Sequence, residues 1–343
     1  QILESLTVVK TFTPDVPGFF LSVWVVSDAL AFATGPQGVW SFDGAAWTKM
    51  AGAFGGNTTT ATSATDVWTG ANGGQAYHYD GVTWTFAQIG PPGGGVVEMH
   101  ARSATDVWAA GGAGLLVHYD GDAWSQASGA IPASAFLVDM ETAETPAGEL
   151  VAFATARDFS TGGLAIYQRG ADGTWAQTGP ESGALVVAAH GANDVWALLG
   201  RSAHHFDGSA WSTVAVSAPP LPNASAHTND ACATADGAFF AVGSNFGSIR
   251  DTYILRYDGA AWVTDVDFAE FANRADPLVK QIFCVGNDVW ISGPDELWRR
   301  TASGWERHGL HALAEGRQPA RGFVGETAWW AMTTGPTDTT TGI

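Results

Sequence analysis

The sequence contains few charged residues, few bases and almost no cysteine. Charged residues make up 14% of the 343 residues, whereas soluble domains usually contain about 25%. The chain has 15 Lys and Arg residues and 34 Asp and Glu residues, so its net charge is −19. Such an acidic chain is not expected to bind nucleic acid or an anionic membrane. No apolar run reaches the roughly 18 residues that a transmembrane helix needs, so no transmembrane segment is expected.

Several motifs of enzymes and metal proteins are also missing. The two cysteines lack the spacing of a zinc site, so no metal site is predicted. Neither a Gly-x-Ser-x-Gly turn nor a phosphate-binding loop occurs. The first four residues have neither the basic nor the apolar region of a signal peptide. Because the composition is poor in Lys and rich in Thr, Ser, Gly and Trp, we expect an exported bacterial protein, located extracellularly, at the cell surface or in the periplasm.

The abundant residues are glycine and tryptophan, with 43 and 16 copies, and both follow an internal repeat. A first motif, Ser-Ala-Thr-Asp-Val-Trp, occupies residues 63–68 and 103–108, and shorter copies end at Trp196 and Trp290. A second motif, aromatic-Asp-Gly-x-x-Trp, follows it, for example at 79–84 and 119–124. Asp-Gly between two alternating runs is the strongest short-range signal for a β-hairpin. Each repeat therefore predicts four short strands and no helix.

The period of the repeat predicts the architecture. Eight copies start between Asp28 and Ala328, about 43 residues apart, and four strands in such a period are typical of a β-propeller. We predict an all-β, eight-bladed β-propeller in which residues 5–10 pair with the C-terminal strands and close the ring. Seven blades are the alternative. The single domain, 1–343, would divide into units near 15–50, 57–88, 96–128, 135–178, 184–215, 229–266, 279–308, and 320–343 with 1–14.

The paired motifs resemble the repeats of secreted bacterial β-propeller proteins. The Asp-Gly-x-x-Trp hairpin is also distantly similar to the Asp-box of sialidase-type and photosystem-assembly-factor-type propellers. It differs from the Asp-box because Asp and Gly are adjacent here and no Ser precedes them at the usual spacing. The resemblance covers essentially the whole chain. It implies the fold but no particular ligand, because propellers have many functions.

The repeated residues are predicted to be structural. A Trp at the same place in every blade is expected to bury its ring between neighbouring sheets. The Asp of each turn is expected to accept hydrogen bonds from nearby backbone amides. The residues before the aromatic, His78, His118, His205 and Arg256, are expected to lie at half-exposed strand positions; one lectin site per blade is the alternative. We expect no cofactor, although turn carboxylates could bind calcium.

Polar residues outside the repeat are better candidates for a site. Glu98, Asp139 and Glu141 lie on the predicted innermost strands, and general acid–base catalysis needs two converging carboxylates. If the protein is an enzyme, these three are the catalytic candidates. His100 and His190 are expected nearby as ligand-binding candidates. The alternative is a water-filled channel lined by satisfied polar groups.

Two further sets of residues carry predictions. Cys232 and Cys284 fall on predicted innermost strands of neighbouring blades, where they could form a disulfide or remain free buried thiols. Loops carry specificity on a rigid scaffold, and the longest insertions belong to the later blades. Their aromatic and basic residues are ligand-binding candidates, with packing onto their own blade as the alternative: Phe246, Phe268, Phe271 and Arg274.

The leading interpretation is a non-enzymatic, exported binding or scaffold propeller that recognises a protein or a surface glycan through loops on one face. One alternative is a carbohydrate-active enzyme with an acid pair at the channel mouth. Another is a docking component of an extracellular assembly. The oligomeric state stays open.

Overall fold

The computed structural model consists of antiparallel sheets and contains no helix among the residues that it describes. These are 21–27, 29–43, 45–127, 131–144, 150–170, 172–179, 186–199, 202–217, 226–245, 252–265, 281–285, 287–292, 296–301, 304–309, 318–324 and 329–334. No helix in this part of the chain could therefore cross a membrane.

The first four sheets each contain four strands in chain order. The first has β1 (Ser22–Ser27), β2 (Leu30–Gly35), β3 (Gly38–Phe42) and β4 (Trp47–Lys49). The second has β5 (Thr58–Ser63), β6 (Asp66–Ala71), β7 (Gln75–Tyr79) and β8 (Trp84–Gln88). The third has β9 (Val96–Ser103), β10 (Asp106–Gly111), β11 (Leu116–Tyr119) and β12 (Trp124–Gln126). The fourth has β13 (Ala135–Glu144), β14 (Leu150–Asp158), β15 (Leu164–Arg169) and β16 (Trp175–Thr178).

The later sheets vary more. The fifth has β17 (Val186–Gly191), β18 (Asp194–Leu199), β19 (Ser202–Phe206) and β20 (Trp211–Val214). The sixth has β22 (Ala226–Ala233), β23 (Phe239–Asn245), β24 (Thr252–Tyr257) and β25 (Trp262–Thr264), and β21 (Val216–Ser217) pairs in parallel with β25. The seventh has β26 (Gln281–Val285), β27 (Asp288–Ser292), β28 (Glu296–Thr301) and β29 (Gly304–Gly309). The last described sheet pairs β30 (Gln318–Val324) with β31 (Trp329–Thr334).

The two motifs occupy fixed places in these sheets. Asp-Val-Trp begins the second strand, as in β6 and β10, and Asp-Gly forms the turn between the third and fourth strands. Gly81 in one such turn has a φ of 94°, a conformation that strains other residues. A Cβ atom there would also lie 2.8 Å from the Thr65 side chain. The repeated glycine is therefore required by both backbone conformation and space.

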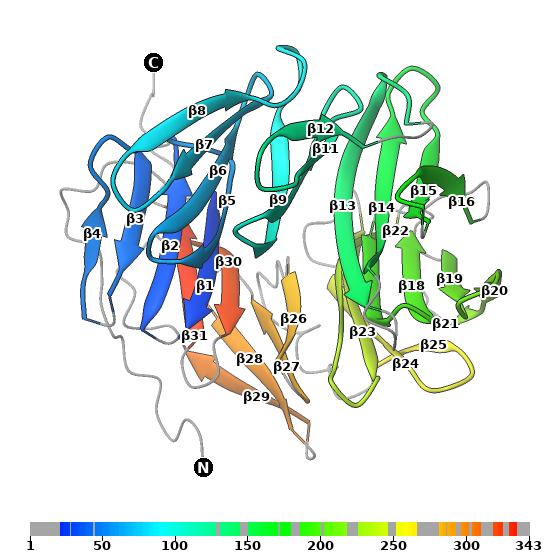
Figure 1. The fold of residues 1–343 in the computed structure, drawn as a ribbon. Coiled ribbons are helices and arrows are strands. Elements are labelled where there is room, and N and C mark those ends of the chain that lie inside the picture. The colour runs from blue at the N-terminus through cyan, green and yellow to red at the C-terminus, as the bar shows by residue number, and fades with distance from the viewer. Residues whose placement is uncertain are drawn as a thin grey trace, which may run out of the picture.

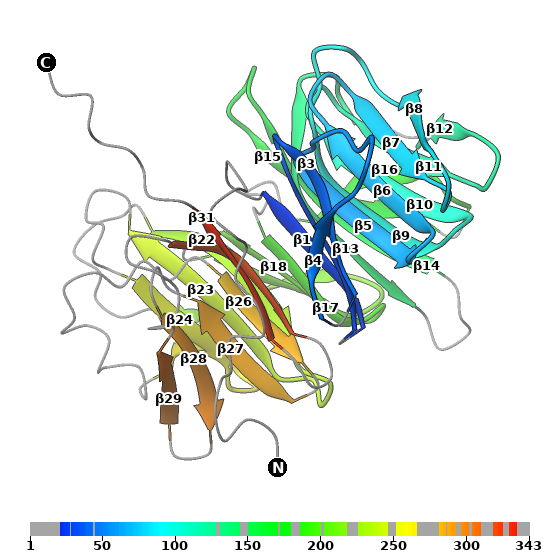
Figure 2. The same cartoon turned by 90° about the vertical axis from the view of Figure 1, so that its left-hand side faces the viewer.

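The first strands of successive sheets lie side by side. They contact one another in the order β1, β5, β9, β13, β17, β22, β26 and β30, and β30 also contacts β1 (Figure 1). Figure 2 shows β22 to β24 beside β26 to β28. The predicted all-β fold is confirmed. The count of eight blades stays a prediction, because the proposed closing strands at 5–10 and 339–343 lie outside the described residues.

The apolar core lies between neighbouring sheets rather than within one. Trp68 of β6 is 3% exposed and packs with Met99, Val107 and Leu115 of the third sheet. Trp196 of β18 packs in the same way against Phe239 of the sixth sheet. A buried Trp contributes a large apolar area. These repeated Trp residues therefore join the second sheet to the third and the fifth to the sixth, and this rigid frame positions the polar residues described below.

Candidate functional site

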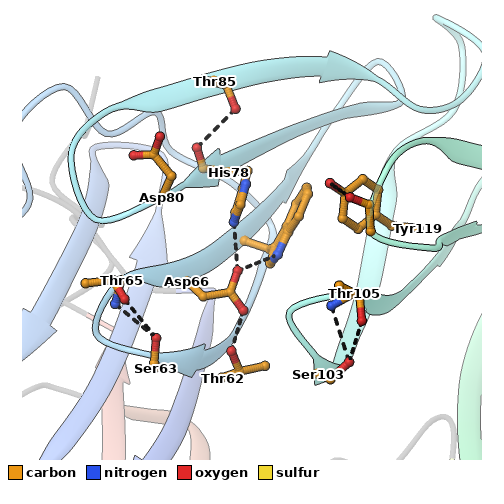
Figure 3. Close-up of polar contacts among 12 residues, drawn as sticks. Thr62, Ser63, Thr65, Asp66, His78, Asp80, Thr85, Ser103, Thr105 and Tyr119 are labelled. Atoms are coloured by element: carbon orange, nitrogen blue, oxygen red, sulfur yellow. Dashed lines mark hydrogen bonds and ion pairs between the residues drawn. The ribbon is translucent and has the colours of Figure 1, made fainter.

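Each intact repeat holds a carboxylate between two strands. The Asp66 carboxylate on β6 accepts a hydrogen bond from Trp68 Nε1 at 3.2 Å and lies 2.7 Å from His78 Nε2 on β7 (Figure 3). The Thr62 hydroxyl donates to its other oxygen. The His78 ring stacks on Trp68, with centroids 3.9 Å apart. Burial opposes ionisation of Asp66, but the hydrogen bonds from His78, Thr62 and Trp68 outweigh it and lower its pKa.

The same arrangement recurs in other sheets. His118 Nε2 lies 2.9 Å from the Asp106 carboxylate, and His205 Nε2 lies 2.8 Å from that of Asp194. In the seventh sheet Arg299 replaces the histidine and donates to both oxygens of Asp288 at 2.8 Å. Sequence reasoning missed this role of the repeated histidine. The signal was present, because an Asp precedes a His by 11 or 12 residues in each of these copies.

The turn aspartates are partnered by their own backbone. Asp80 Oδ1 accepts hydrogen bonds from the amides of Val82 and Thr83 at 2.9 and 2.8 Å. In the equivalent turn the Ala210 and Ser209 amides and the Ser209 hydroxyl lower the pKa of Asp207 to about 2. These carboxylates form the turns in the way the sequence analysis expects.

A second group of polar residues, here called the axial cluster, consists of Glu98 and His100 on β9 and Asp139 and Glu141 on β13. His100 pairs with Trp108 and Glu141 with Phe153 across their strands, so both occupy the same place in adjacent sheets. His100 Nε2 lies 3.3 Å from Glu98 Oε1. The His100 ring also meets the Trp24 ring of β1 edge-on, with centroids 5.8 Å apart. Side chains from three sheets thus meet within the circle of first strands.

Asp139 bridges two first strands. Its Oδ1 accepts the Met140 amide hydrogen at 3.0 Å, and its Oδ2 accepts that of Val187 on β17 at 2.9 Å. Asp230 joins the sixth and seventh sheets in the same way. Its carboxylate accepts the amide hydrogen of Ala231 at 2.9 Å and that of Ile282 on β26 at 3.1 Å. Both aspartates follow an irregularity in the strand register. Both oxygens of each carboxylate are therefore engaged in joining neighbouring sheets.

Glu141 differs from the other carboxylates of the axial cluster. Among the described residues no hydrogen bond to its side chain occurs. Burial and the nearby charges of Asp139, Glu98 and Asp230 raise its pKa to about 8, although His100 opposes this effect. Its side chain is partly exposed. Within the described part of the chain, Glu141 is thus the carboxyl group of the axial cluster that accepts no hydrogen bond.

Burial and neighbouring charges also shift the pKa values of Asp139 and His100. Burial and the charge of Glu98 raise the pKa of Asp139 to about 7, although the amides of Val187 and Met140 oppose the shift. Burial alone would lower the pKa of His100, but the bond to Glu98 and the nearby carboxylates raise it. No group of three or more His, Cys, Asp or Glu side chains is arranged to hold a metal ion in the described part of the chain.

The other predicted site residues lie elsewhere. His190 is exposed, and its Nε2 donates to the Ala235 carbonyl at 3.1 Å, away from the axial cluster. Cys232 on β22 and Cys284 on β26 are bonded as a disulfide between neighbouring first strands. The four loop candidates lie outside the described residues: Phe246, Phe268, Phe271 and Arg274.

Comparison with known proteins shows the fold alone. No protein-family model and no curated protein matches the chain. Three solved structures that match it are YCF48 bound to D1 peptide (12% identity, TM-score 0.54, 95% of both chains), the Dos1 propeller (9%, 0.63, 93% of this chain and 91% of that one) and the GH74 xyloglucanase from Xanthomonas campestris (14%, 0.53, 93% and 55%). The β-propeller fold predicted from the repeats is thereby confirmed.

Proposed function

We propose that this propeller is a non-enzymatic binding or scaffold module that acts outside the cytoplasm and recognises a protein segment at the ring axis. The observation that carries the proposal is Glu141, a carboxyl group that faces other carboxylates and has no hydrogen-bond partner among the described residues. Crowded carboxylates in a buried setting oppose one another's ionisation. A Lys or Arg side chain from a partner would supply the missing charge and hydrogen bonds.

Binding is favoured over catalysis because the other carboxylates of the axial cluster are engaged. Both oxygens of Asp139 hold backbone amides, and Glu98 is paired with His100. A general acid–base pair needs two carboxyl groups that can exchange protons with a substrate. Glu141, which accepts no hydrogen bond among the described residues, suits binding of a cation better than acid–base catalysis.

Two further observations support the proposed partner and location. YCF48, a propeller of similar fold, was solved with a D1 peptide bound, which favours a peptide as the class of partner. The disulfide between Cys232 and Cys284 favours an oxidising compartment. The chain is therefore proposed to be exported.

The experiment compares a peptide that contains one Arg with the same peptide containing uncharged citrulline, by calorimetry between pH 6 and 9. Affinity for the Arg peptide should rise with pH, because Glu141, whose pKa is about 8, must release its proton to pair with the cation. Glu141→Gln should weaken binding by about tenfold or more and reduce the pH dependence, leaving the part contributed by Asp139, whose pKa is about 7. Asp122→Asn, which removes an exposed charge, is the matched control. Equal binding of both peptides would contradict the proposal.

A carbohydrate-active enzyme is the second candidate. The observation in its favour is that a carboxyl with a pKa of about 8 stays protonated at neutral pH, as a general acid must. A GH74 xyloglucanase also shares the fold. Release of reducing sugar from xyloglucan by the wild type, with loss in Glu141→Gln, would establish this function and displace the first.

We also propose that the ring has eight blades and that residues 5–10 supply the outer strand of the last one. The contacts of β30 with both β26 and β1 support a ring completed by this sheet. Closure removes exposed sheet edges, which stabilises the fold. Deletion of residues 1–14 should then lower the midpoint of thermal unfolding by several degrees or more. An unchanged midpoint would contradict closure by these residues.

A further inference from the structure

A polar groove lies on the outer rim between the fourth and fifth sheets, far along the sheets from their first strands. Its volume is about 620 Å³. One wall comes from β15 and β16 and the other from β19, β20 and the turn between them. The side chains that matter for its chemistry are Gln168, Thr178, His204, Trp211, Ser212 and Thr213.

The groove coincides with a degenerate copy of the repeat. In the second sheet Trp68 pairs with His78 across the strands, and the two stacked rings are held by Asp66. The fourth sheet has Phe153 paired with Gln168 at the same place. Val151 stands two residues before Phe153, where the intact motif has its aspartate.

These three changes alter the surface between the sheets. Phe153 is smaller than Trp and is fully buried, so it contributes nothing to the groove surface. Gln168 has no carboxylate partner and no hydrogen bond to its side chain among the described residues. The loss of the motif therefore leaves an amide group free to face the groove instead of a histidine engaged with Asp.

The described residues of the lining include no charged side chain, although the chain carries a net charge of −19. Trp211 Nε1 donates to Thr178 Oγ1 at 3.0 Å, which fixes the half-buried indole in the wall. His204 Nδ1 lies 3.2 Å from Thr213 Oγ1, and burial lowers the pKa of His204, so the imidazole is neutral near pH 7. The groove thus offers hydroxyl groups, an amide and one half-buried aromatic side chain, whereas His204 is 3% exposed and belongs to the wall.

We propose that this rim groove binds a neutral oligosaccharide. Sugar hydroxyl groups match an amide and hydroxyl lining, and the apolar face of a pyranose ring matches an indole. Because the described lining residues carry no charge, uronic acids and other anionic sugars are disfavoured, since their carboxylates would find no cationic partner among these residues. The groove is separate from the axial cluster, so this site does not depend on the function proposed there.

The test uses the full chain with cellotetraose, maltotetraose and xylotetraose as probes and tetragalacturonate as the anionic counterpart. The NMR signal of the Trp211 indole N–H, assigned by its loss in Trp211→Phe, reports on the groove directly. At least one neutral probe should shift this signal with saturation in the millimolar range, and the anionic probe should not.

Two glutamines on neighbouring strands give a matched pair of variants. Gln168 lines the groove, whereas Gln177 of β16 is exposed and does not line it. Gln168→Ala should weaken binding about five- to tenfold, the value of one or two hydrogen bonds, and Gln177→Ala should not. Ala210→Trp, which adds a large side chain to the wall, should abolish binding. No shift with any neutral probe, equal losses in both glutamine variants, or equal binding of tetragalacturonate would overturn the proposal.

Discussion

The carboxylates of the repeat and those of the axial cluster are the same chemical groups in opposite states. Asp66 and the turn aspartates accept several hydrogen bonds, and their pKa values are lowered. Asp139 and Glu141 are crowded by other carboxylates, and their pKa values are raised to about 7 and 8. The fold stabilises the ionised form of the first set, whereas burial and neighbouring carboxylates oppose the ionisation of Asp139 and Glu141.

This difference separates architecture from function. The repeated aspartates have their hydrogen-bonding capacity satisfied by the strands and turns that they join, so little is left for a ligand. Glu141 belongs to no repeat and accepts no hydrogen bond from the part of the chain that the structure describes. Groups kept in an unfavourable state by a rigid frame are candidates for binding. Three variants test whether the two sets of carboxylates differ in this way.

The largest effect is expected from Asp66→Ala. Asp66 is 7% exposed, and removal of its carboxylate leaves Trp68 Nε1, His78 and the Thr62 hydroxyl without their acceptor. Unfolding free energy should fall by about 2–4 kcal/mol in chemical denaturation.

The matched control is Val151→Ala, at the same place in the fourth sheet but without a carboxylate. It should cost only about 1 kcal/mol, as expected for methyl groups lost from a half-buried site. Equal losses in the two variants would show that the Asp–His–Trp arrangement adds no stability beyond packing.

A smaller effect of opposite sign is expected from Glu141→Gln. The unfolded chain loses this proton near pH 4, whereas the folded protein keeps it up to about pH 8. The folded state therefore binds more protons between these values, and stability falls as pH rises from 5 to 9. The glutamine variant should be about 1–2 kcal/mol more stable than wild type at pH 9, with a flatter profile. A variant with an unchanged pH profile would show that Glu141 ionises normally.

Much of the fold could be predicted because each repeat carries the same local sequence pattern for strands and an Asp-Gly turn. The Asp-Val-Trp part of the first motif, residues 106–108, lies in β10 (Asp106–Gly111), and Gly81 and Gly121 in the Asp-Gly turns have positive φ. The parallel strand β21 could not be predicted in the same way. It is two residues long, and pairing with β25 from outside the sheet leaves no periodic pattern in the sequence.

Only part of the site could be predicted, because the strand register decides which side chains lie together. Glu98, His100, Asp139 and Glu141 occur on first strands at corresponding positions, so strand alternation brings them together. His190 lies where the pairing of β17 and β18 skips a residue between Ala189 and Gly191. Such a bulge redirects the side chain. The same irregularity lies at Thr62 and Arg102, which also stand four residues before the motif aspartate, so it could have been recognised only by comparing the repeats in the structure.

The smallest effect is expected at the exposed turns, and it tests the other half of the comparison. Asp207→Ala removes the acceptor of two backbone amides and the Ser209 hydroxyl, whereas Asp207→Asn keeps an oxygen at that place. The alanine variant should therefore unfold at a lower temperature than the asparagine variant at pH 7. Because the pKa of Asp207 is about 2 in the folded protein, its contribution is present above the unfolded value near 4 and is lost as pH falls toward 2. Over that range Glu141 is already protonated in the folded protein, so its charge does not change while the turn carboxylates lose theirs. Identical melting of the alanine and asparagine variants would mean that the turn carboxylates do not stabilise the fold through these hydrogen bonds.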